Sequence, residues 1–234
     1  MRSLENEAFD SGEFLKYRVH YGWINAGEAF VQVRKKQERG ARSVYHIHGE
    51  GHSTGMFRWG YKVDYILDSY VDTESMVPCE FVRDVRDGGY ELYREINFDQ
   101  LNEVAYTDGD TFQVPANVQD LLSAFYYSRT VDMSNMSIGD TISIPTFLDH
   151  EIFPLILVYR GKTVVDSDLG DIDCLAFQPI VQVGRVFKEA EGMTIYVSDD
   201  ANRIPVQLKS ELMFGSVKID LTSAKGLKTP LRTH

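Results

Sequence analysis

The chain has 234 residues, with 24 Lys or Arg against 35 Asp or Glu, and therefore a formal net charge of −11 at pH 7. A surface this acidic is a poor partner for nucleic acid, whose phosphates require clustered Lys and Arg, and anionic lipid headgroups would repel it. A content of 43% hydrophobic and 25% charged residues is typical of a folded globular protein and excludes a disordered chain.

Two kinds of segment are not expected. No run approaches the ~20 apolar residues that a membrane-spanning helix needs, so we predict no transmembrane segment. Residues 1–7 lack the apolar stretch of a secretory signal, so we expect no signal in the sequence as written. Residues 1–12 are predicted to be an N-terminal segment that precedes the folded domain.

The first half of the chain alternates between apolar and polar residues, which predicts half-buried β-strands. Every second residue from Leu15 to Tyr21 is apolar, and a second alternating run reaches Val33 after a turn at residues 25–27. Residues 14–35 are therefore predicted to form a β-hairpin. Alternation returns from Tyr61 to Leu67, and further short strands are expected at residues 77–84, 89–98 and 102–107.

One segment has helical rather than strand periodicity. Asn117 is the expected N-cap, with Asp120 at the third helical position, and apolar residues then recur at helical spacing from Leu121 to Tyr126. We predict one short helix at about residues 117–130. Because its apolar stripe is too short for a helical bundle, we expect it to cover the sheet or to close one end of a barrel.

The second half again predicts strands separated by short turns. They are expected at residues 152–159, 163–165, 173–178, 192–197, 204–214 and 216–221, with a turn at residues 160–162 between the first two. Strands that follow one another so closely predict an antiparallel arrangement. The predicted fold is mainly β: a single half-open antiparallel β-barrel or strongly curved sheet over residues 13–225, followed by a C-terminal tail at residues 226–234.

The string of residues 51–55, Gly-His-Ser-Thr-Gly, matches the nucleophile elbow of serine hydrolases. The elbow requires a tight turn from a parallel strand into a helix, and we expect neither the parallel sheet nor the helix here. The downstream histidines are His150 and His234. We therefore interpret Ser53 as a residue of a glycine-rich loop and predict no catalytic residue. Asp199 and Asp200 are interpreted as turn residues rather than as a catalytic pair.

Three histidines and a glutamate lie at alternate positions of one predicted strand: His46, His48, Glu50 and His52. Their side chains would share one face of the strand, and imidazole and carboxylate are ligands of zinc and iron. Neighbours on that face are about 6.5–7 Å apart, so a tight site needs a ligand from another strand. His20 or residues 149–151 could supply it, but nothing in the sequence places them nearby. We favour a polar strand face and expect no metal or other cofactor.

Aromatic residues are abundant, with 13 Tyr, 13 Phe and 2 Trp, and many fall on the apolar face of the predicted strands. Inward-facing aromatic side chains could line a cavity for an apolar ligand inside a barrel, or they could simply fill its core. Both interpretations stay open. The candidate ligand-binding residues are Tyr17, Tyr61, Tyr65 and Phe125.

The two cysteines, Cys79 and Cys174, do not have the spacing of a metal site. They could form one long-range disulfide, or they could be two small buried side chains. The sequence does not decide between these alternatives.

Three passages, in this order, resemble a family of exported, β-rich bacterial proteins known as domain of unknown function 3108. They are residues 17–28 (YRVHYGWINAGE), 118–129 (VQDLLSAFYYSR) and 198–206 (SDDANRIPV). The resemblance spans nearly the whole chain. It implies an exported, periplasmic or envelope-associated protein, because members typically carry an export signal. It also implies an architecture similar to lipoprotein carriers of the LolA and LolB type, in which a helix covers the apolar side of a half-open barrel.

The family has no established catalytic residues to carry over. The residues of this chain that match its motifs are Asp120, Ser123, Arg129, Asp200 and Arg203, and a role in folding explains them. We expect a non-enzymatic envelope protein that binds or carries an apolar ligand, such as a lipid or an acyl chain. The alternatives are a structural or assembly module that binds another envelope protein through its surface and, least favoured, a hydrolase or metal enzyme.

Overall fold

The computed structural model describes residues 1–180, 192–211 and 216–234. In this part of the chain, fifteen strands form one antiparallel sheet. The strands of the first half are β1 (Phe14–Tyr21), β2 (Ile24–Val33), β3 (Gln37–Arg39), β4 (Arg42–Ser53), β5 (Val63–Asp72), β6 (Pro78–Asp87), β7 (Tyr90–Asp99), β8 (Val104–Thr107) and β9 (Asp110–Gln113). Those of the second half are β10 (Thr141–Leu148), β11 (Glu151–Ser167), β12 (Gly170–Ile180), β13 (Met193–Ser198), β14 (Pro205–Glu211) and β15 (Ser216–Lys225).

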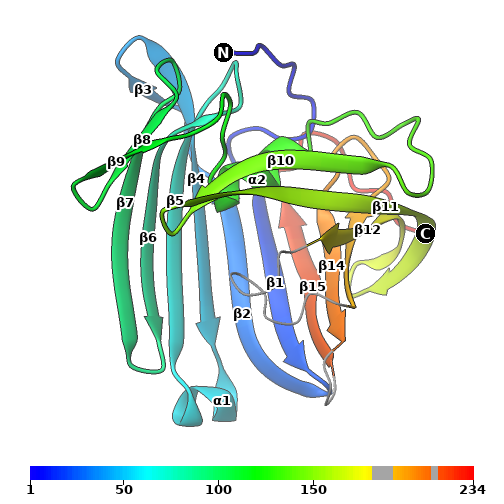
Figure 1. The fold of residues 1–234 in the computed structure, drawn as a ribbon. Coiled ribbons are helices and arrows are strands. Elements are labelled where there is room, and N and C mark those ends of the chain that lie inside the picture. The colour runs from blue at the N-terminus through cyan, green and yellow to red at the C-terminus, as the bar shows by residue number, and fades with distance from the viewer. Residues whose placement is uncertain (181–191, 212–215) are drawn as a thin grey trace.

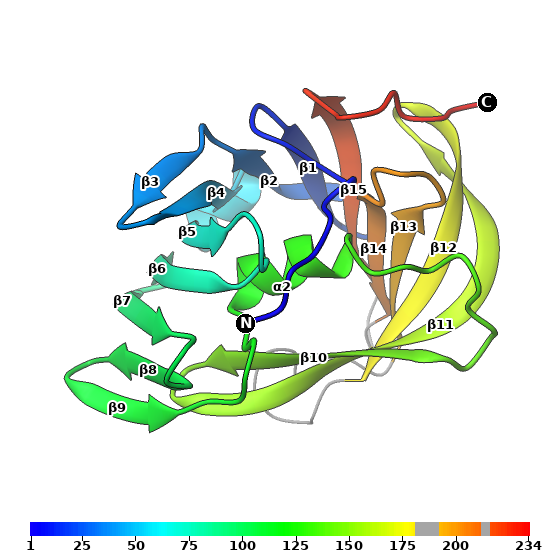
Figure 2. The same ribbon diagram turned by 90° about the horizontal axis from the view of Figure 1, so that it is seen from above.

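The sheet curls around a central helix without closing into a hydrogen-bonded barrel. Its order runs β10-β11-β12-β13-β14-β15-β1-β2-β4-β5-β6-β7-β8-β9, with β3 paired to β4. Seen from above, this path goes around the helix and brings β10 back toward β8 and β9 (Figure 2). The predicted half-open antiparallel architecture is confirmed. Its strands extend from Phe14 to Lys225.

In the described part of the chain, no continuous hydrogen-bonded ladder joins the two ends of the sheet. Side chains join them, together with two backbone hydrogen bonds between β10 and Gln119, which precedes α2. The ring of Phe147 on β10 lies 5.4 Å from that of Phe112 on β9. In the β10–β11 turn, Asp149 accepts a hydrogen bond from Arg94 at 2.6 Å, and His150 contacts Asp108 at 2.8 Å. We call these contacts between β10 and the β7–β9 edge the seam.

The central helix is α2 (Leu121–Ser128), which lies inside the curl of the sheet (Figures 1 and 2). Its N-cap is Asp120, which accepts hydrogen bonds from the amides of Leu122 and Ser123, and the Ser123 hydroxyl accepts one from the Asp120 amide in return. The predicted helix is therefore present but shorter than residues 117–130. Asn117 is not its cap, because its φ of +59° places it in a left-handed turn before the helix.

Helix α2 joins two parts of the core. Leu122 and Tyr126 pack among side chains of β2 and β4–β8, whereas Ala124 packs among those of β10–β13. The N-terminal segment contributes to the first part, since Phe9 is fully buried and meets the ring of Tyr126 edge-on at 4.6 Å. Residues 1–12 therefore cover α2 rather than trail away from the domain.

Several elements differ from the sequence-based expectation. A second helix, α1 (Gly55–Gly60), follows β4, and strands β3, β9 and β10 were not predicted. The segment at residues 160–162 is not a turn: β11 continues through it with a shift of register between Tyr159 and Gly161, whose φ is +110°. The part of the predicted strand 204–214 beyond Glu211 lies outside the described residues.

Neither α1 nor α2, the helices of the described residues, is long and apolar enough to cross a membrane. The cysteines are free: Cys174 is buried in β12, and Cys79 is half-buried in β6. Of the two alternatives left open for them, the structure has separate thiols. Asp200 accepts hydrogen bonds from the amides of Asn202 and Arg203, which confirms a turn at this point.

Candidate functional site

The lower half of the curled sheet contains an apolar pocket. Strands β1, β2 and β4–β7 extend below α2 toward α1 (Figure 1), and the pocket of about 290 Å³ lies among the inner-face residues of this part. Its surface is almost entirely apolar. The volume is near the lower limit of the roughly 300–1,000 Å³ that small-molecule sites have. Residues that line it include Val19, Ala26, Gly27, Ala29, Gly51, Phe57, Tyr61, Val63 and Tyr65.

Small residues on two strands account for the hollow. Along the inner face of β2, Val33 is a buried core residue, but the positions nearest α1 are Ala29 and Gly27. On β4, the inner face changes in the same way from Ile47 to Gly51. Because successive residues of a strand alternate between faces, this change leaves the upper interior filled and the lower interior open.

Tyr61 and Tyr65 both belong to the pocket wall and direct their polar ends to Asp87. The Tyr65 hydroxyl donates to Asp87 Oδ2 at 2.9 Å. Burial, together with this hydrogen bond, raises the pKa of Tyr65 to about 12. The pKa of Tyr61 is also raised, chiefly by the neighbouring Asp87 carboxylate. Since the Tyr65 hydroxyl is bound to Asp87, its ring is left to form part of the apolar wall.

The other two candidate ligand residues lie elsewhere. Tyr17 is buried in a core cluster with Leu15 and Leu221, and its hydroxyl donates to the carbonyl of Pro205 at 3.1 Å. Phe125, on α2, is half-buried and packs edge-on against Tyr126. Neither side chain is part of the pocket wall.

Exposed apolar side chains surround the end of the sheet at which the pocket lies. Trp23, in the β1–β2 turn, is 92% exposed, and Trp59, on α1, is 95% exposed. Met56 on α1, Tyr61 after it and Tyr90 at the start of β7 are also exposed. These five residues, which we call the apolar rim, belong to α1, to turns and to the first position of β7, all at the lower end of the molecule (Figure 1).

Ser53 lies at the end of β4, directly before α1, so the sequence-based expectation that no helix follows it was wrong. The sheet around it is nevertheless antiparallel, as expected. The Ser53 hydroxyl accepts a hydrogen bond from the Val63 amide at 3.0 Å, which holds the ends of β4 and β5 together. The two histidines downstream of Ser53 have other partners: His150 contacts Asp108, and His234 contacts Asp173.

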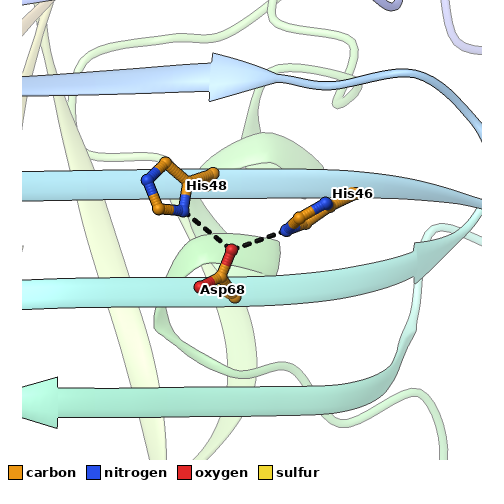
Figure 3. Close-up of side chains that lie close together, drawn as sticks. All are labelled: His46, His48 and Asp68. Atoms are coloured by element: carbon orange, nitrogen blue, oxygen red, sulfur yellow. Dashed lines mark hydrogen bonds and ion pairs between the residues drawn. The ribbon is translucent and has the colours of Figure 1, made fainter.

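A second group of polar side chains lies on the opposite, convex face of the sheet. His46 and His48 project from β4 toward Asp68 on β5, and α2 is behind the sheet in this view (Figure 3). Asp68 Oδ1 is 2.5 Å from His46 Nε2 and 2.7 Å from His48 Nδ1. The three ligand atoms all lie within 4.8 Å of one another.

The two histidine side chains of the cluster are buried, and each affects the pKa of Asp68. His46 is 6% exposed and His48 is 4% exposed. Burial would raise the pKa of Asp68, but the hydrogen bonds from the two histidines outweigh it and hold this pKa well below its usual range. The hydrogen bond to Asp68 raises the pKa of His48, against the effect of burial, and Glu50 adds to the rise.

The sequence indicated two members of this cluster but not the third. His52 shares the strand with His46 and His48 but does not belong to the converging group. Neither His20 nor residues 149–151 supply the third ligand. The residue that completes the cluster is Asp68, which lies directly opposite His48 in the register of β4 and β5. The alternation of residues 61–68 placed Asp68 on a polar strand face, but no local signal gives the register between two strands.

Comparison with one solved structure supports the fold. A β-barrel-like protein of domain of unknown function DUF1849 from Brucella abortus superposes with a TM-score of 0.62 at 9% sequence identity, and the alignment covers 93% of this chain and 98% of that one. A DUF1089 family protein from Pseudomonas aeruginosa gives a TM-score of 0.43 at 11% identity, covering 80% and 91% of the two chains. None of the curated proteins matches the sequence. The model of the family described as "Protein of unknown function (DUF3108)" matches residues 16–222, and the chain belongs to that family.

Proposed function

We propose that this protein binds an apolar chain, such as the acyl group of a lipid or of a lipoprotein, in the pocket below α2, and that it carries this chain in the bacterial envelope without catalysing a reaction. The observation that carries the proposal is the almost entirely apolar pocket at the point where the inner faces of β2 and β4 change from large to small residues. If this part of the interior were a filled core, large residues would continue to the end of both strands.

The apolar rim supports the same proposal. Large exposed apolar side chains usually mark a surface that meets another apolar phase or partner. Here they surround the end at which the pocket lies. A carrier needs such a surface, because an acyl chain must pass from its donor into the pocket without crossing water. The family resemblance implies an envelope location. It also implies an architecture similar to that of LolA and LolB, which are lipoprotein carriers.

A second candidate is an assembly module that binds another envelope protein through its surface. Trp23 and Trp59 favour it as well, because tryptophan is enriched at the centres of protein interfaces. The two candidates differ in what the pocket does. A carrier requires the pocket to be open to a ligand, whereas a surface module would bind its partner equally well with the pocket filled.

Filling the pocket from Gly51 tests the proposal. A Cβ at Gly51 would lie 3.7 Å from the Ala29 Cβ and 4.0 Å from the Glu28 carbonyl oxygen, which are ordinary contacts. Gly51→Val should therefore fold normally while its methyl groups occupy the pocket. Because these methyl groups take space that the ligand would occupy, we expect the Kd for a fluorescent fatty acid to rise about tenfold or more.

The matched control is Ser223→Val, on the convex face of β15 opposite Lys16. It adds a similar side chain to a strand but leaves the pocket unchanged, so its Kd should stay within about twofold of the original. Native mass spectrometry of the purified chain should also detect bound lipid, and less of it in Gly51→Val. Equal affinity in the two variants, or no binding by the original protein, would refute the carrier proposal.

A further inference from the structure

The cluster of His46, His48 and Asp68 has the composition of a metal site and lies apart from the apolar pocket, on the other face of the sheet. Two imidazoles and one carboxylate suit Zn²⁺, which takes nitrogen and oxygen ligands at about 2.0–2.2 Å. In a tetrahedral site these bond lengths separate ligand atoms by about 3.3 Å. The present 2.5 and 2.7 Å contacts would therefore need to open by less than 1 Å to admit the ion.

The strand register explains why these three side chains converge. His46 and His48 are two residues apart on β4 and so share a face. Asp68 faces the same side of β5 and is paired with His48, while Tyr70 is paired with His46. The Asp68 carboxylate thus reaches the space between the two rings, and one oxygen contacts both. This is the ligand from a second strand that two histidines of one strand need.

The outer ring nitrogens are held as they are in metal proteins. A histidine that binds a metal through one nitrogen usually donates its other N–H to a carboxylate or an amide, which fixes the ring. The Nε2 atom of His48 is 2.7 Å from Glu50 Oε1. The Nδ1 atom of His46 is 3.4 Å from the side-chain amide of Gln37, whose oxygen could accept this N–H after a half-turn of the amide. Both inner nitrogens therefore remain directed at Asp68.

Neighbouring side chains fix the histidine rings but leave the Asp68 carboxylate accessible to an ion from solvent. Tyr70 stacks on His46, with ring centroids 4.6 Å apart and planes 18° from parallel. The Asp68 side chain is 21% exposed, so an ion can reach the carboxylate from solvent. Arg34 Nη1 is 4.0 Å from Asp68 Oδ1, and its charge would have to move aside. The Arg34 side chain is 42% exposed and is free to do so.

We propose that His46, His48 and Asp68 bind one divalent transition-metal ion, best matched by Zn²⁺, with Glu50 and Gln37 as the residues that orient the two rings. Three protein ligands leave a fourth position for water or for a group of a partner. The site is independent of the acyl-chain proposal, because its residues face away from the pocket.

The test is a calorimetric titration of the full chain, purified without a histidine tag and stripped with a chelator, with zinc chloride near neutral pH. We expect one Zn²⁺ per chain. Asp68→Asn and His48→Ala should raise the Kd more than about 100-fold, and Glu50→Gln about 10–100-fold. The control is His52→Ala, on the same strand but outside the cluster, which should change the Kd less than about twofold.

A measurement on the original protein tests the site without relying on variants that could fail to fold. On addition of zinc, the NMR signals of the His46 and His48 side chains should shift, whereas those of His20 and His150 should stay in place. No saturable binding, or binding that Asp68→Asn leaves intact, would overturn the proposal, as would zinc-induced shifts confined to other histidines.

Discussion

Arg129 and Glu13 form a two-pronged ion pair in the interior of the protein, with Nη1–Oε1 and Nη2–Oε2 distances of 2.6 and 2.7 Å. The Arg129 side chain is 1% exposed and that of Glu13 is fully buried. Arg129 also donates to the carbonyls of Asn202 and Ala8, and the Tyr126 hydroxyl donates to Glu13. The pair therefore joins the end of α2 to the N-terminal segment and to the loop before β14.

Arg129→Met should lower the free energy of unfolding by about 3–5 kcal/mol, because it leaves the Glu13 carboxylate buried without its counter-charge. Urea unfolding followed by circular dichroism measures this loss. The double variant Glu13→Gln with Arg129→Met should be more stable than Arg129→Met alone, since it removes the uncompensated charge. A loss below about 1 kcal/mol in the single variant would contradict the burial of this pair.

Asp120 makes the stability of the fold depend on pH in an unusual direction. Burial raises its pKa from 3.8 to about 6, against hydrogen bonds from Ser123, Ser69 and Leu122. As pH rises from about 4 to about 6, the unfolded chain loses this proton while the folded chain keeps it, so the stability that protonated Asp120 contributes is lost as pH passes about 6. Two pKa units correspond to about 3 kcal/mol.

Asp120→Asn tests this dependence, because asparagine caps a helix as well as aspartate does but does not titrate. We expect the stability of the original protein relative to the variant to fall by about 3 kcal/mol between pH 4 and pH 7. Unfolding curves at several pH values give this difference. If the difference stayed constant or rose with pH, Asp120 would not be protonated in the folded state at pH 4–6.

Phe9 should be as important to stability as a residue of the sheet. It is fully buried and contacts the rings of Tyr45 and Tyr126 at 5.3 and 4.6 Å. Phe9→Ala should therefore cost about 3–5 kcal/mol. Phe14→Ala is the matched control, since Phe14 is only half-buried and stacks on Phe30. Similar unfolding midpoints for the two variants would mean that residues 1–12 are not part of the core.

The apolar rim should affect the uptake of an acyl chain from a membrane more than its binding. We expect the double variant Trp23→Ser with Trp59→Ser to lose at least about tenfold in affinity for neutral phosphatidylcholine vesicles, because each apolar side chain contributes roughly 1.5–3 kcal/mol when buried. Its Kd for a dissolved fluorescent fatty acid should change less than about twofold.

The control for this pair is Leu101→Ser, which removes an exposed apolar side chain from the β7–β8 turn at the opposite end of the sheet. Vesicle flotation and fatty-acid titration measure the two properties separately. Unchanged flotation of the tryptophan variant would show that the rim does not meet a membrane.

The sequence predicted strands where alternation is regular and failed where one residue has two structural meanings. The hairpin of β1 and β2 follows from period-two alternation and a turn at residues 25–27. Gly161 was taken for a turn residue, but a glycine with positive φ serves equally well in a bulge, and β11 runs on through it. Strand β10 contains Pro145, which is tolerated because β10 is an edge strand.

The candidate sites show the same limit. Tyr61 and Tyr65 were named from the sequence and both line the pocket, since alternation assigns residues to a face. The hollow itself depends on which small residues of different strands come to lie side by side, as Gly51 and Ala29 do. That pairing, like the approach of Asp68 to His48, is a property of register, which arises from the whole sheet rather than from any local run of residues.

Side-chain packing in the seam helps to set the width of the interior. In a barrel closed by hydrogen bonds, the diameter follows from the number of strands and their stagger. In the described part of this chain the ladder stops at β9 and β10, and contacts such as Phe112–Phe147 and Arg94–Asp149 span the gap. The width of the interior therefore depends at this point on how a few side chains pack, and not only on the backbone ladder of the sheet.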